Sequence, residues 1–232
     1  TGNDILIGNS GNDIIFGGAG NDTVLGGSGD DTIYGDAGDD LIFGHEGRDV
    51  INAGDGNDTI FASIGDGDDA IHGGAGTDTL NLEALTQGVT VDLLSGLASG
   101  AQSGNDTLSG IENVIGGAGN DTIVAGIGVN VLDGGGGSDT FIFTSVAAAD
   151  GDQIVGFQQG DHIDLRPLFQ SLALPTGDDF SFTSATFNQA GQVRLNVVDG
   201  DTIVEGNTDA QADIDFTIKV VGRVLTSTDF IT

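Results

Sequence analysis

Apolar residues recur at a fixed interval along the first third of the chain. Each lies in the middle of a three-residue segment rich in β-forming residues, such as Thr23-Val24-Leu25. Because alternate side chains of a strand share a face, we expect the middle residue to point inward and its neighbours, often Thr, to point outward. The interval is nine residues, with one of eleven, and the middle residues are Leu6, Ile15, Val24, Ile33, Ile42, Ile51, Ile60, Ile71 and Leu80.

Six residues of the form G-G-x-G-x-D separate these segments. Glycine permits positive φ, so we predict turns rather than regular structure at these positions. The row from Ala62 to His72 carries two extra residues, and the row from Gly73 restores the frame. Nine turns end in an aspartate, namely Asp4, Asp13, Asp22, Asp31, Asp40, Asp49, Asp58, Asp69 and Asp78.

Two rows make one coil of 18 residues with two turns and two strands. A fixed period of this kind is typical of repeat architectures whose units stack on one another. We therefore predict an all-β fold, a right-handed parallel β-roll in which two short sheets enclose a thin aliphatic core. Such a core does not by itself offset a chain entropy of about 1–2 kcal/mol per residue, so the turns must contribute to stability.

The repeat pattern of the sequence changes twice after this region. Residues 82–115 break the period, with a predicted strand at Gly88–Leu93 and one repeat-like turn at Asp106, before rows return with turns at Asp121, Asn130 and Asp139. From about Thr144 short alternating segments replace the repeats. We predict a regular β-roll over residues 1–81, wider coils of the same solenoid and a second repeat block over 82–143, and a β-rich cap over 144–232. The alternating segments are Gln153–Phe157, His162–Leu165, Gln192–Val198, Thr202–Glu205 and Asp215–Val221.

The charge of the chain indicates that folding of the solenoid depends on counter-ions. The chain has 36 acidic and 5 basic residues, a net charge of −31, and only four of the acids are glutamates. We expect a chain that repels itself until cations bind, and a charge of this sign disfavours nucleic acid as a partner. Cysteine is absent, which excludes disulfides and thiolate metal sites. No apolar run is long enough to span a membrane, and no signal peptide is visible. The chain begins within a repeat, so we expect it to be part of a longer protein.

The turns have the chemistry of calcium sites. Ca²⁺ takes about 6–8 oxygen ligands, and each turn offers one carboxylate and several backbone carbonyls. Turns 18 residues apart are expected to lie about 4.8 Å from one another, so Asp13 and Asp31 share an ion, as do Asp22 and Asp40. Nine turns allow seven such sites, with one more between Asp121 and Asp139, and we expect roughly 6–9 ions. The candidate ligands are the nine aspartates above, Asp106, Asp121 and Asp139, together with Gly17, Ala19, Gly26, Ser28, Gly35, Ala37, Gly44 and Glu46.

The rows GGAGNDTVL and GGSGDDTIY resemble the calcium-binding nonapeptides of RTX (repeats-in-toxin) proteins, over roughly residues 1–81 and 103–143. The resemblance implies a β-roll that binds Ca²⁺ between its turns. Three positions depart from the pattern: Arg48 and Thr77 stand where Asn or Asp is usual, and Asn130 replaces the final Asp. We expect these turns to hold ions weakly.

The segments GGGGSDTFIF, DQIVGFQQGDHIDL, AGQVRLNVVDGDTIVEGN and VLTSTDFIT are similar to the C-terminal module of serralysin-type secreted proteases, from about Gly134 to Thr232. Related modules follow mannuronan epimerases and lipases. The resemblance implies an extracellular protein of a Gram-negative bacterium, with an upstream domain and the type I secretion machinery as partners. It also implies an uncleaved secretion signal at Asp229, Phe230, Ile231 and Thr232, although Thr232 is polar where the family prefers an aliphatic residue.

Other interpretations of single motifs are weaker. His45-Glu46 begins like the zinc-protease motif H-E-x-x-H, but the second His is missing, and His72 and His162 are isolated. The acidic ladder could be a solvated face, which its strict period and paired glycines argue against. The alternating polar residues of the segment 207–215 are either an irregular calcium loop or a polar hairpin loop, and we prefer the second. They are Asn207, Asp209, Gln211, Asp213 and Asp215.

No catalytic Ser/His/Asp set and no phosphate-binding loop is visible, so we predict a non-catalytic module. It would fold on Ca²⁺ after type I secretion and stabilise a larger secreted protein. The alternative is an adhesin or S-layer segment, or a polysaccharide-binding module of an extracellular enzyme. In that case four basic residues near the C-terminus would form a small surface for an anionic glycan: Arg166, Arg194, Lys219 and Arg223.

Overall fold

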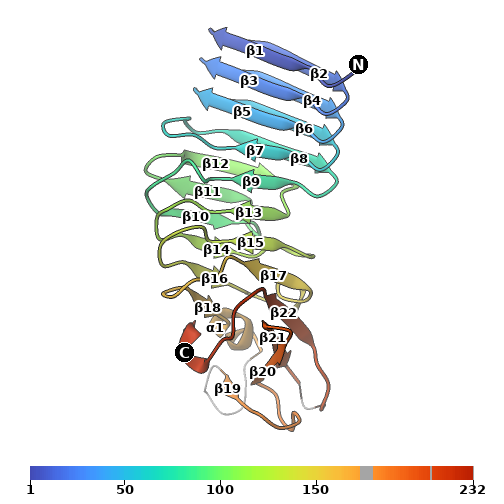
Figure 1. Cartoon of the computed structure of the whole chain (residues 1–232), viewed down its shortest axis with the longest axis vertical. Helices are drawn as coiled ribbons and strands as arrows, with labels where there is room; N and C mark the ends of the chain where they lie inside the picture. Colours follow the sequence, from blue (N-terminus) through green and yellow to red (C-terminus); the bar gives the residue numbers. More distant parts are fainter. Residues whose placement is uncertain (173–179, 210, 232) are drawn as a thin grey trace.

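Two β-sheets run side by side along the molecule, which we describe from a computed structural model (Figure 1). The structure describes residues 1–172, 180–209 and 211–231. In the repeat region successive strands alternate between the sheets, and each strand pairs in parallel with the strand two positions later. The predicted all-β class and parallel roll are confirmed.

Within the described residues, one sheet has twelve strands and the other eleven. In spatial order the first contains β1 (Ile5–Ser10), β3 (Thr23–Ser28), β5 (Leu41–Glu46), β7 (Thr59–Phe61), β9 (Thr79–Asn81), β13 (Asn113–Ile115), β15 (Val131–Asp133), β17 (Asp152–Val155), β22 (Phe216–Val220), β21 (Asp201–Asn207), β20 (Gln192–Val198) and β19 (Ser181–Phe182). The second contains β2 (Ile14–Ala19), β4 (Thr32–Ala37), β6 (Val50–Asp55), β8 (Ala70–Ala75), β12 (Gly104–Ser109), β11 (Leu97–Gly100), β10 (Val89–Asp92), β14 (Thr122–Val124), β16 (Thr140–Ile142), β18 (His162–Asp164) and β23 (Phe230–Ile231).

In the repeat region the core is a double column of inward-pointing side chains, with one large side chain from each strand. Val24 pairs with Leu6 on one side and Ile42 on the other, and the register repeats through the roll. Eight of the nine predicted inward residues are buried, and the ninth, Leu6, is partly buried against the core. Because each strand contributes a single large inward residue, the core is as thin as its sequence period predicts.

The strands are longer than predicted, because the first three residues of G-G-x-G-x-D continue the ladder instead of forming a turn. In β3 and β5 the pairing resumes after a bend, with Gly27 opposite His45. Both residues have positive φ, 117° and 68°. Identical rows stack in register, so the backbone groups of G-G-x meet the same groups in the next coil and pair without help from side chains. Only the last three residues of each six form the turn.

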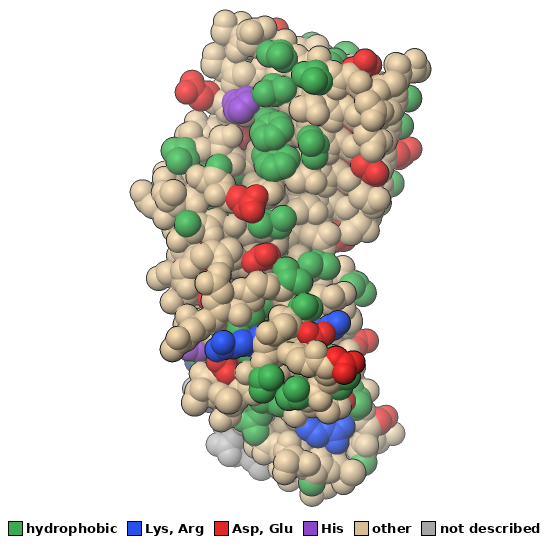
Figure 2. All heavy atoms as spheres, viewed as in Figure 1, with side chains coloured by type: hydrophobic (Ala, Val, Ile, Leu, Met, Phe, Trp, Pro, Cys, Tyr) green, Lys and Arg blue, Asp and Glu red, His purple; other side chains and the backbone are tan. Residues whose placement is uncertain are grey.

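The outer face of the roll is more apolar than an alternation with Thr would suggest. Phe43 stacks on Phe61 at 4.3 Å between ring centroids, and Phe16 stacks on Tyr34 at 4.9 Å. Figure 2 shows hydrophobic side chains gathered in a stripe over the N-terminal half of the visible face. Such cross-strand pairs stabilise neighbouring strands, so these rings join coils from outside as the core joins them from inside.

Residues 82–115 lengthen the coil, because β12 pairs in parallel with β8 and β13 with β9, and hydrogen bonds between these coils span 37 and 34 residues. The predicted strand at Gly88–Leu93 is present as β10, but β10, β11 and β12 form an antiparallel meander inserted between β8 and β14. The chain reverses after β10 in a tight turn, where Gly96 has a φ of 70° and its N–H donates to the Asp92 carbonyl at 2.9 Å. The parallel ladders continue on both sides of this insertion.

Both sheets also continue across residue 144, where the recognisable repeats end. β17 pairs in parallel with β15, and β18 pairs in parallel with β16. The meander β20–β21–β22 then attaches to β17, and β23 attaches to β18. Beneath α1 (Arg166–Gln170) five rings pack together, from Phe169, Phe180, Phe182, Phe216 and Phe230. This C-terminal structure covers the last coil, as a solenoid requires. Two 3₁₀ turns, η1 (Val146–Ala148) and η2 (Ser227–Asp229), complete the elements, and no helix of the described residues is long and apolar enough to cross a membrane.

Truncation of a core residue should destabilise the roll far more than truncation of its neighbour. Ile42 is fully buried, whereas the adjacent Leu41 is 42% exposed. We expect Ile42→Ala to cost about 2–5 kcal/mol, because it leaves a cavity between Val24 and Ile60, and Leu41→Ala to cost much less. Urea unfolding midpoints in saturating calcium measure both. Equal shifts for the two variants would contradict the assignment of inward and outward faces.

Candidate metal centres

The aspartates that end the turns form a ladder along each edge of the roll. One carboxylate oxygen, Oδ1, accepts the backbone N–H of the aspartate one coil earlier, as between Asp22 and Asp4 at 2.8 Å or Asp40 and Asp22 at 2.7 Å. The same bond joins Asp31 to Asp13 on the other edge at 2.8 Å. Turns 18 residues apart are therefore direct neighbours, which is the geometry that a shared ion would need.

The second carboxylate oxygen of these residues has no protein partner. In the described residues the Oδ2 atoms of nine turn aspartates are buried without a hydrogen bond, those of Asp13, Asp22, Asp31, Asp40, Asp49, Asp58, Asp78, Asp139 and Asp152. A buried charged oxygen without a partner is costly, and native structures rarely leave one unsatisfied. Its recurrence at one position of the repeat indicates that a cation is the missing partner.

A second oxygen faces several of these atoms across a glycine. A Cβ placed on Gly17 would lie 2.7 Å from Asp22 Oδ2 and 2.7 Å from the carbonyl oxygen of Gly35, one coil later. At Gly26 the corresponding atoms are Asp31 Oδ2 at 2.5 Å and the Gly44 carbonyl oxygen at 2.8 Å. At Gly17 and Gly26 the absence of a Cβ leaves this space open. Oxygens from two successive coils converge on it, and a set made of oxygens alone suits Ca²⁺.

Burial perturbs the carboxylates of these ladders strongly. It raises the pKa of Asp49 and Asp58 to about 6 and that of Asp69 to about 8, while backbone N–H donors lower these values and neighbouring carboxylates raise them further. Asp106 and Asp139 rise to about 7, again mainly by burial. Without a cation, burial therefore shifts the protonation equilibrium of these carboxyl groups towards their protonated forms in the folded chain.

The predicted glycine and third-position residues take two different places. Gly17, Gly26, Gly35 and Gly44 line the space beside the unpaired oxygens. The carbonyls of Ala19, Ser28, Ala37 and Glu46 instead accept N–H groups from glycines of the preceding coil, at 2.7–2.8 Å. A carbonyl oxygen has two lone pairs, so these four oxygens retain one acceptor site each.

Three turns close on themselves. The second oxygen of Asp121 accepts the N–H of Gly117 at 2.8 Å, and Asn130 accepts that of Gly126 at 2.9 Å. Asp161 is closed in the same manner by Gln158, at 2.6 Å. The predicted pair Asp121–Asp139 is brought together, since Asp139 Oδ1 accepts the Asp121 N–H, but only Asp139 keeps an unpaired oxygen.

The ladders contain three acids that sequence reasoning missed. Glu112 Oε2 accepts the Asp78 N–H at 2.8 Å, and Asp152 and Asp161 accept those of Asn130 and Asp139 at 2.7 and 3.0 Å. Asp106, which was predicted, accepts the Asp69 N–H from 37 residues away. The signal for all three missed acids was an acid two residues before an apolar residue, as in the regular D-x-apolar triplet.

A second ladder runs along the fifth residue of each turn, in the opposite direction. Asn21 donates its N–H to Asn3 Oδ1 at 3.0 Å, Asp39 donates to Asn21 at 3.1 Å, and Asn57 donates to Asp39 at 2.8 Å. Asn and Asp serve equally here, because only a neutral or charged oxygen acceptor is needed. Arg48 and Thr77 donate to the preceding coil but offer no carboxylate or amide oxygen to the next one.

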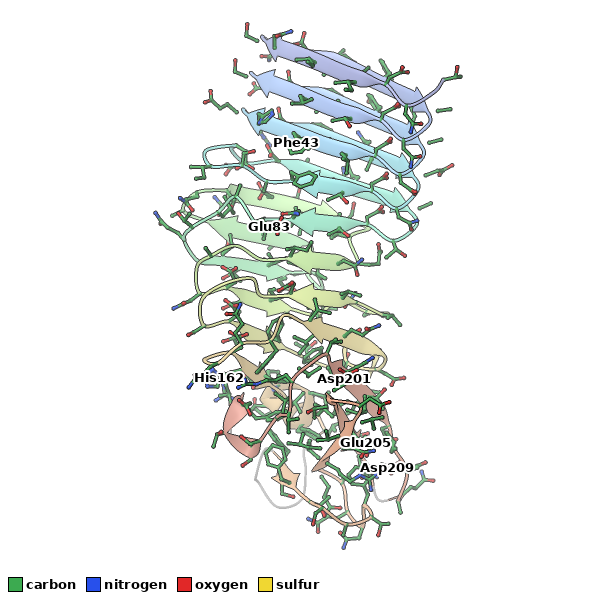
Figure 3. All side chains as sticks on the ribbon, viewed as in Figure 1. Phe43, Glu83, His162, Asp201, Glu205 and Asp209 are labelled. Atoms are coloured by element: carbon green, nitrogen blue, oxygen red, sulfur yellow. The ribbon has the colours of Figure 1, made fainter. Side chains whose placement is uncertain are left out.

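Residues 207–209 and 211–215 form hydrogen bonds with one another at the end of β21. Asp215 accepts from Thr208, Asp209 accepts from Gln211, and Asn207 donates to the Asp213 carbonyl at 3.0 Å. One carboxylate oxygen from each of three residues, Asp209, Asp213 and Asp215, lies within 4.8 Å of the others. In Figure 3 Asp201, Glu205 and Asp209 mark this end of the molecule.

Three of the four basic residues of the C-terminal part form ion pairs with acids, and the fourth is Arg223. Arg166 pairs with Asp164 at 2.8 Å, Arg194 with Glu205 at 2.6 Å and Lys219 with Asp201 at 2.9 Å. Figure 2 shows the basic side chains as separate groups beside acidic ones. The charge of the three paired residues is largely neutralised, which weakens the case for an anionic glycan.

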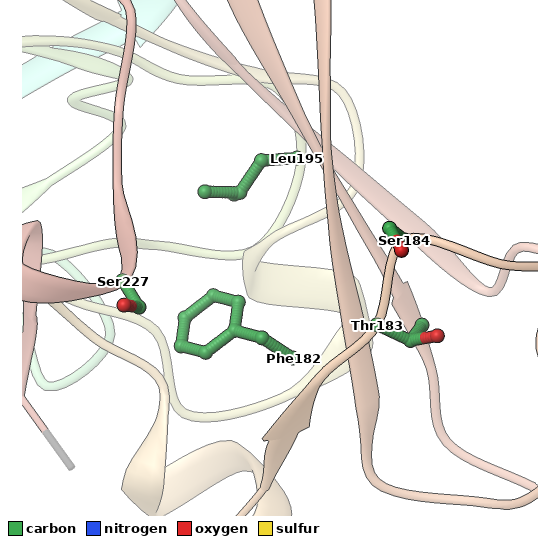
Figure 4. Close-up of a pocket in the computed structure, with 5 residues that line it drawn as sticks. All are labelled: Phe182, Thr183, Ser184, Leu195 and Ser227. Carbon is green, nitrogen blue, oxygen red and sulfur yellow. The ribbon is translucent and has the colours of Figure 1, made fainter.

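The isolated histidines show no metal-site geometry. His72 Nδ1 lies 2.6 Å from Ser109 Oγ on the surface, and His45 stacks on Phe43. A small pocket between β19, β20 and the C-terminal segment is lined by Phe182, Thr183, Ser184, Leu195 and Ser227 (Figure 4). None of these lining residues carries a carboxylate, so this pocket differs in kind from the turn sites.

Comparisons with known proteins agree with this geometry. The family model for the RTX calcium-binding nonapeptide repeat matches residues 1–33, and that for the Peptidase M10 serralysin C terminal matches residues 28–232. The comparison with curated proteins returned no match.

Two solved structures were found at a TM-score of 0.30, too low for them to add to the argument. The AlgE6R3 subunit of the Azotobacter vinelandii mannuronan C5-epimerase is 17% identical over 94% of this chain and 78% of its own. The extracellular lipase LipA from Serratia marcescens is 15% identical, over 93% of this chain and 40% of its own.

The serralysin model covers far more than half of the chain, and its first residues overlap the repeat model. RTX nonapeptide repeats bind calcium, and both models describe non-catalytic regions of secreted, extracellular proteins of Gram-negative bacteria. The chain therefore belongs to the Peptidase M10 serralysin C-terminal family and carries RTX calcium-binding repeats at its N-terminal end.

Proposed function

We propose that this chain is a calcium-dependent C-terminal module that folds on Ca²⁺ after type I secretion and stabilises a larger secreted protein. The observation that carries the proposal is the row of buried, unpaired Asp Oδ2 atoms, several of which face a carbonyl oxygen of the next coil across a glycine. Carboxylates from the turns and carbonyls of their glycines hold roughly 6–9 ions. When bound, Ca²⁺ supplies the positive charge that these oxygens lack.

Charge and core size together support folding on calcium. The net charge of −31 opposes compaction, and each strand of the roll contributes one large buried side chain to a thin core. A ligand that binds only the folded form stabilises it by RT ln(1 + [L]/Kd) for each site. Where free calcium is scarce the chain stays unfolded and fit for a secretion channel, and millimolar calcium outside the cell orders it.

The C-terminal segment supports the order of these events. Phe230 is 5% exposed and pairs through β23 with β18, while Asp229 closes a capping box with Thr226. A secretion machinery that reads Asp229–Ile231 would meet the side chain of Phe230 in accessible form only before folding. Thr232, the last residue of the expected signal, lies outside the described residues.

Calcium should convert the chain from coil to β-structure. In chelator the carboxylates repel one another, so we expect a circular dichroism spectrum dominated by coil, and a strong β signal after calcium is added in excess. Magnesium at the same concentration is the control, because its small octahedral shell fits an irregular oxygen site poorly. A chelated sample as β-rich as the calcium sample would contradict the proposal.

A matched pair of variants separates the two ladders. Asp40→Asn keeps an acceptor for the Asp22 N–H but removes the charge of an unpaired oxygen, whereas Asp39→Asn changes a position where Asn21 and Asn57 serve equally. We expect Asp40→Asn to raise the calcium midpoint of folding about tenfold, or about 1.4 kcal/mol, and Asp39→Asn to change it little. Titration followed by circular dichroism measures both, and equal midpoints for the two variants would count against a cation at Asp40.

Protonation of the buried carboxylates at low pH should replace part of the stabilisation that calcium provides. Folding raises the pKa of Asp49, Asp69 and Asp139 from an ordinary value of 3.8 to between about 6 and 8, mainly through burial, so the folded chain holds protons that the unfolded chain has lost. Metal-free stability is therefore highest near pH 4 and falls as pH rises towards 8. In calcium the trend reverses, because the ion needs ionised carboxylates. Circular dichroism at pH 4.5 and 8 in calcium-stripped buffer tests this, and a metal-free β signal that grows with pH would refute it.

A further inference from the structure

The row with two extra residues, 62–72, keeps its place in the stack. The Asp66 carbonyl accepts the Gly47 N–H at 2.8 Å, the same bond that Asp55 accepts from Gly38 one half-coil earlier. Asp66 therefore occupies the third position of its turn, and the two extra residues lie between the first and third positions. The turn then continues to Asp69, whose Oδ1 accepts the Asp49 N–H at 2.9 Å.

The insertion removes one oxygen from the space beside Asp49. A Cβ placed on Gly26 or Gly35 would meet a first-position carbonyl of the next coil, from Gly44 or Ala53. At Gly44 the three nearest atoms are Asp49 Oδ2, Asp49 Cγ and, at 3.4 Å, Ile51 Cδ1. The carbonyl oxygen of Ala62, which the pattern would place there, is farther away. The Asp49 carboxylate keeps its unpaired Oδ2 but lacks the usual backbone oxygen opposite it.

The side chain of Asp66 turns inward beside Ser63, the residue that follows Ala62. Third-position residues of neighbouring rows, Glu46, Asp55 and Ala75, are exposed, whereas Asp66 is only 3% exposed. Its Oδ2 accepts the Ser63 N–H at 2.6 Å, and its Oδ1 is buried with no partner. Asp49 Oδ2 and Asp66 Oδ1, from turns stacked one coil apart, are thus both buried and unpaired.

The charge of Asp66 is felt by the surrounding ladder. Burial is the main reason why the pKa values of Asp49, Asp69 and Asp106 are raised, and the negative charge of Asp66 raises all three further. The charge of Asp66 therefore acts on acids of the neighbouring coils, to which the bond between the Gly47 N–H and the Asp66 carbonyl also ties its turn.

We propose that Asp66 is a calcium ligand of the interrupted turn, where its carboxylate replaces the backbone carbonyl that the two-residue insertion removes. This inference rests on the proposed function, because it assigns a further ligand to the same row of sites. The insertion then completes a site instead of interrupting the row. With an additional carboxylate, this site should bind Ca²⁺ more tightly than its neighbours, because calcium affinity rises with the number of charged ligands.

The test compares Asp66→Asn with Asp55→Asn in the purified chain, by calorimetric calcium titration with a competing chelator. Asparagine at position 66 still accepts the Ser63 N–H but lacks the charge, and Asp55 is the exposed third-position residue of the preceding row. We expect Asp66→Asn to lose one ion, or to weaken one site about tenfold, and Asp55→Asn to bind as the unchanged chain does.

Asp40→Asn separates failure of this inference from failure of the proposed function. If Asp40→Asn loses calcium and Asp66→Asn binds like Asp55→Asn, Asp66 is not a ligand. If neither Asp40→Asn nor Asp66→Asn alters calcium binding, the proposed function fails with it.

A second measurement covers the case in which Asp66→Asn folds poorly. The urea midpoint is followed against the logarithm of calcium concentration, since the slope reports the number of ions bound on folding. A slope lower by one ion supports a lost ligand. A midpoint that shifts with no change of slope shows that Asp66 only closes its loop, and overturns the proposal.

Discussion

The stacked carboxylates of the turns are the interaction on which the rest of this structure depends. Every coil brings an aspartate directly over the aspartate of the coil before it, at both edges of the roll. One oxygen of each is used to tie the coils together, and the other is buried with nothing to compensate its charge. A thin core and short strands supply little stability to set against this cost, so the fold is coupled to whatever cation occupies the turns.

The two residues that end each turn make different hydrogen bonds to the neighbouring coils. The fifth residue donates its N–H backward to an oxygen one coil earlier, and the sixth donates forward to an oxygen one coil later. The turns are thus held in register by hydrogen bonds of opposite sense, which need only an acceptor and not a charge. A second, charged oxygen is needed at the sixth position alone. This difference explains why Asn and Asp alternate freely at the fifth position while the sixth is Asp in every regular row.

The C-terminal end of the roll is stabilised in a different way. Towards the C-terminus the side-chain oxygen of Asn130 and the second oxygen of Asp161 accept nearby N–H groups, so these two turns need no ion, whereas Asp139 and Asp152 keep an unpaired oxygen. Large aromatic side chains take over, with Phe141, Phe143, Phe169 and Phe216 all fully buried. Near the cap, burial of apolar surface therefore replaces bound cations as the main source of stability. This suits the part of the chain that covers the last coil.

The sequence by itself determined the period, the inward residues, the turn aspartates and their pairing at 18 residues, because each of these follows from local chemistry repeated in register. Strand limits in the cap were also readable, as with Gln192–Val198, which is β20. Only the tertiary structure decided which residues meet where the period fails. The antiparallel path of 82–115 brings Asp69 against Asp106 and Asp78 against Glu112 across 37 and 34 residues. The inward turn of Asp66 depends on a carbonyl displaced in the same loop, and the closure of Asp121 depends on the conformation of its own turn. Residue spacing encodes contacts only while every coil has the same length, and once a loop changes the path of the chain, the partners of a carboxylate are set by packing.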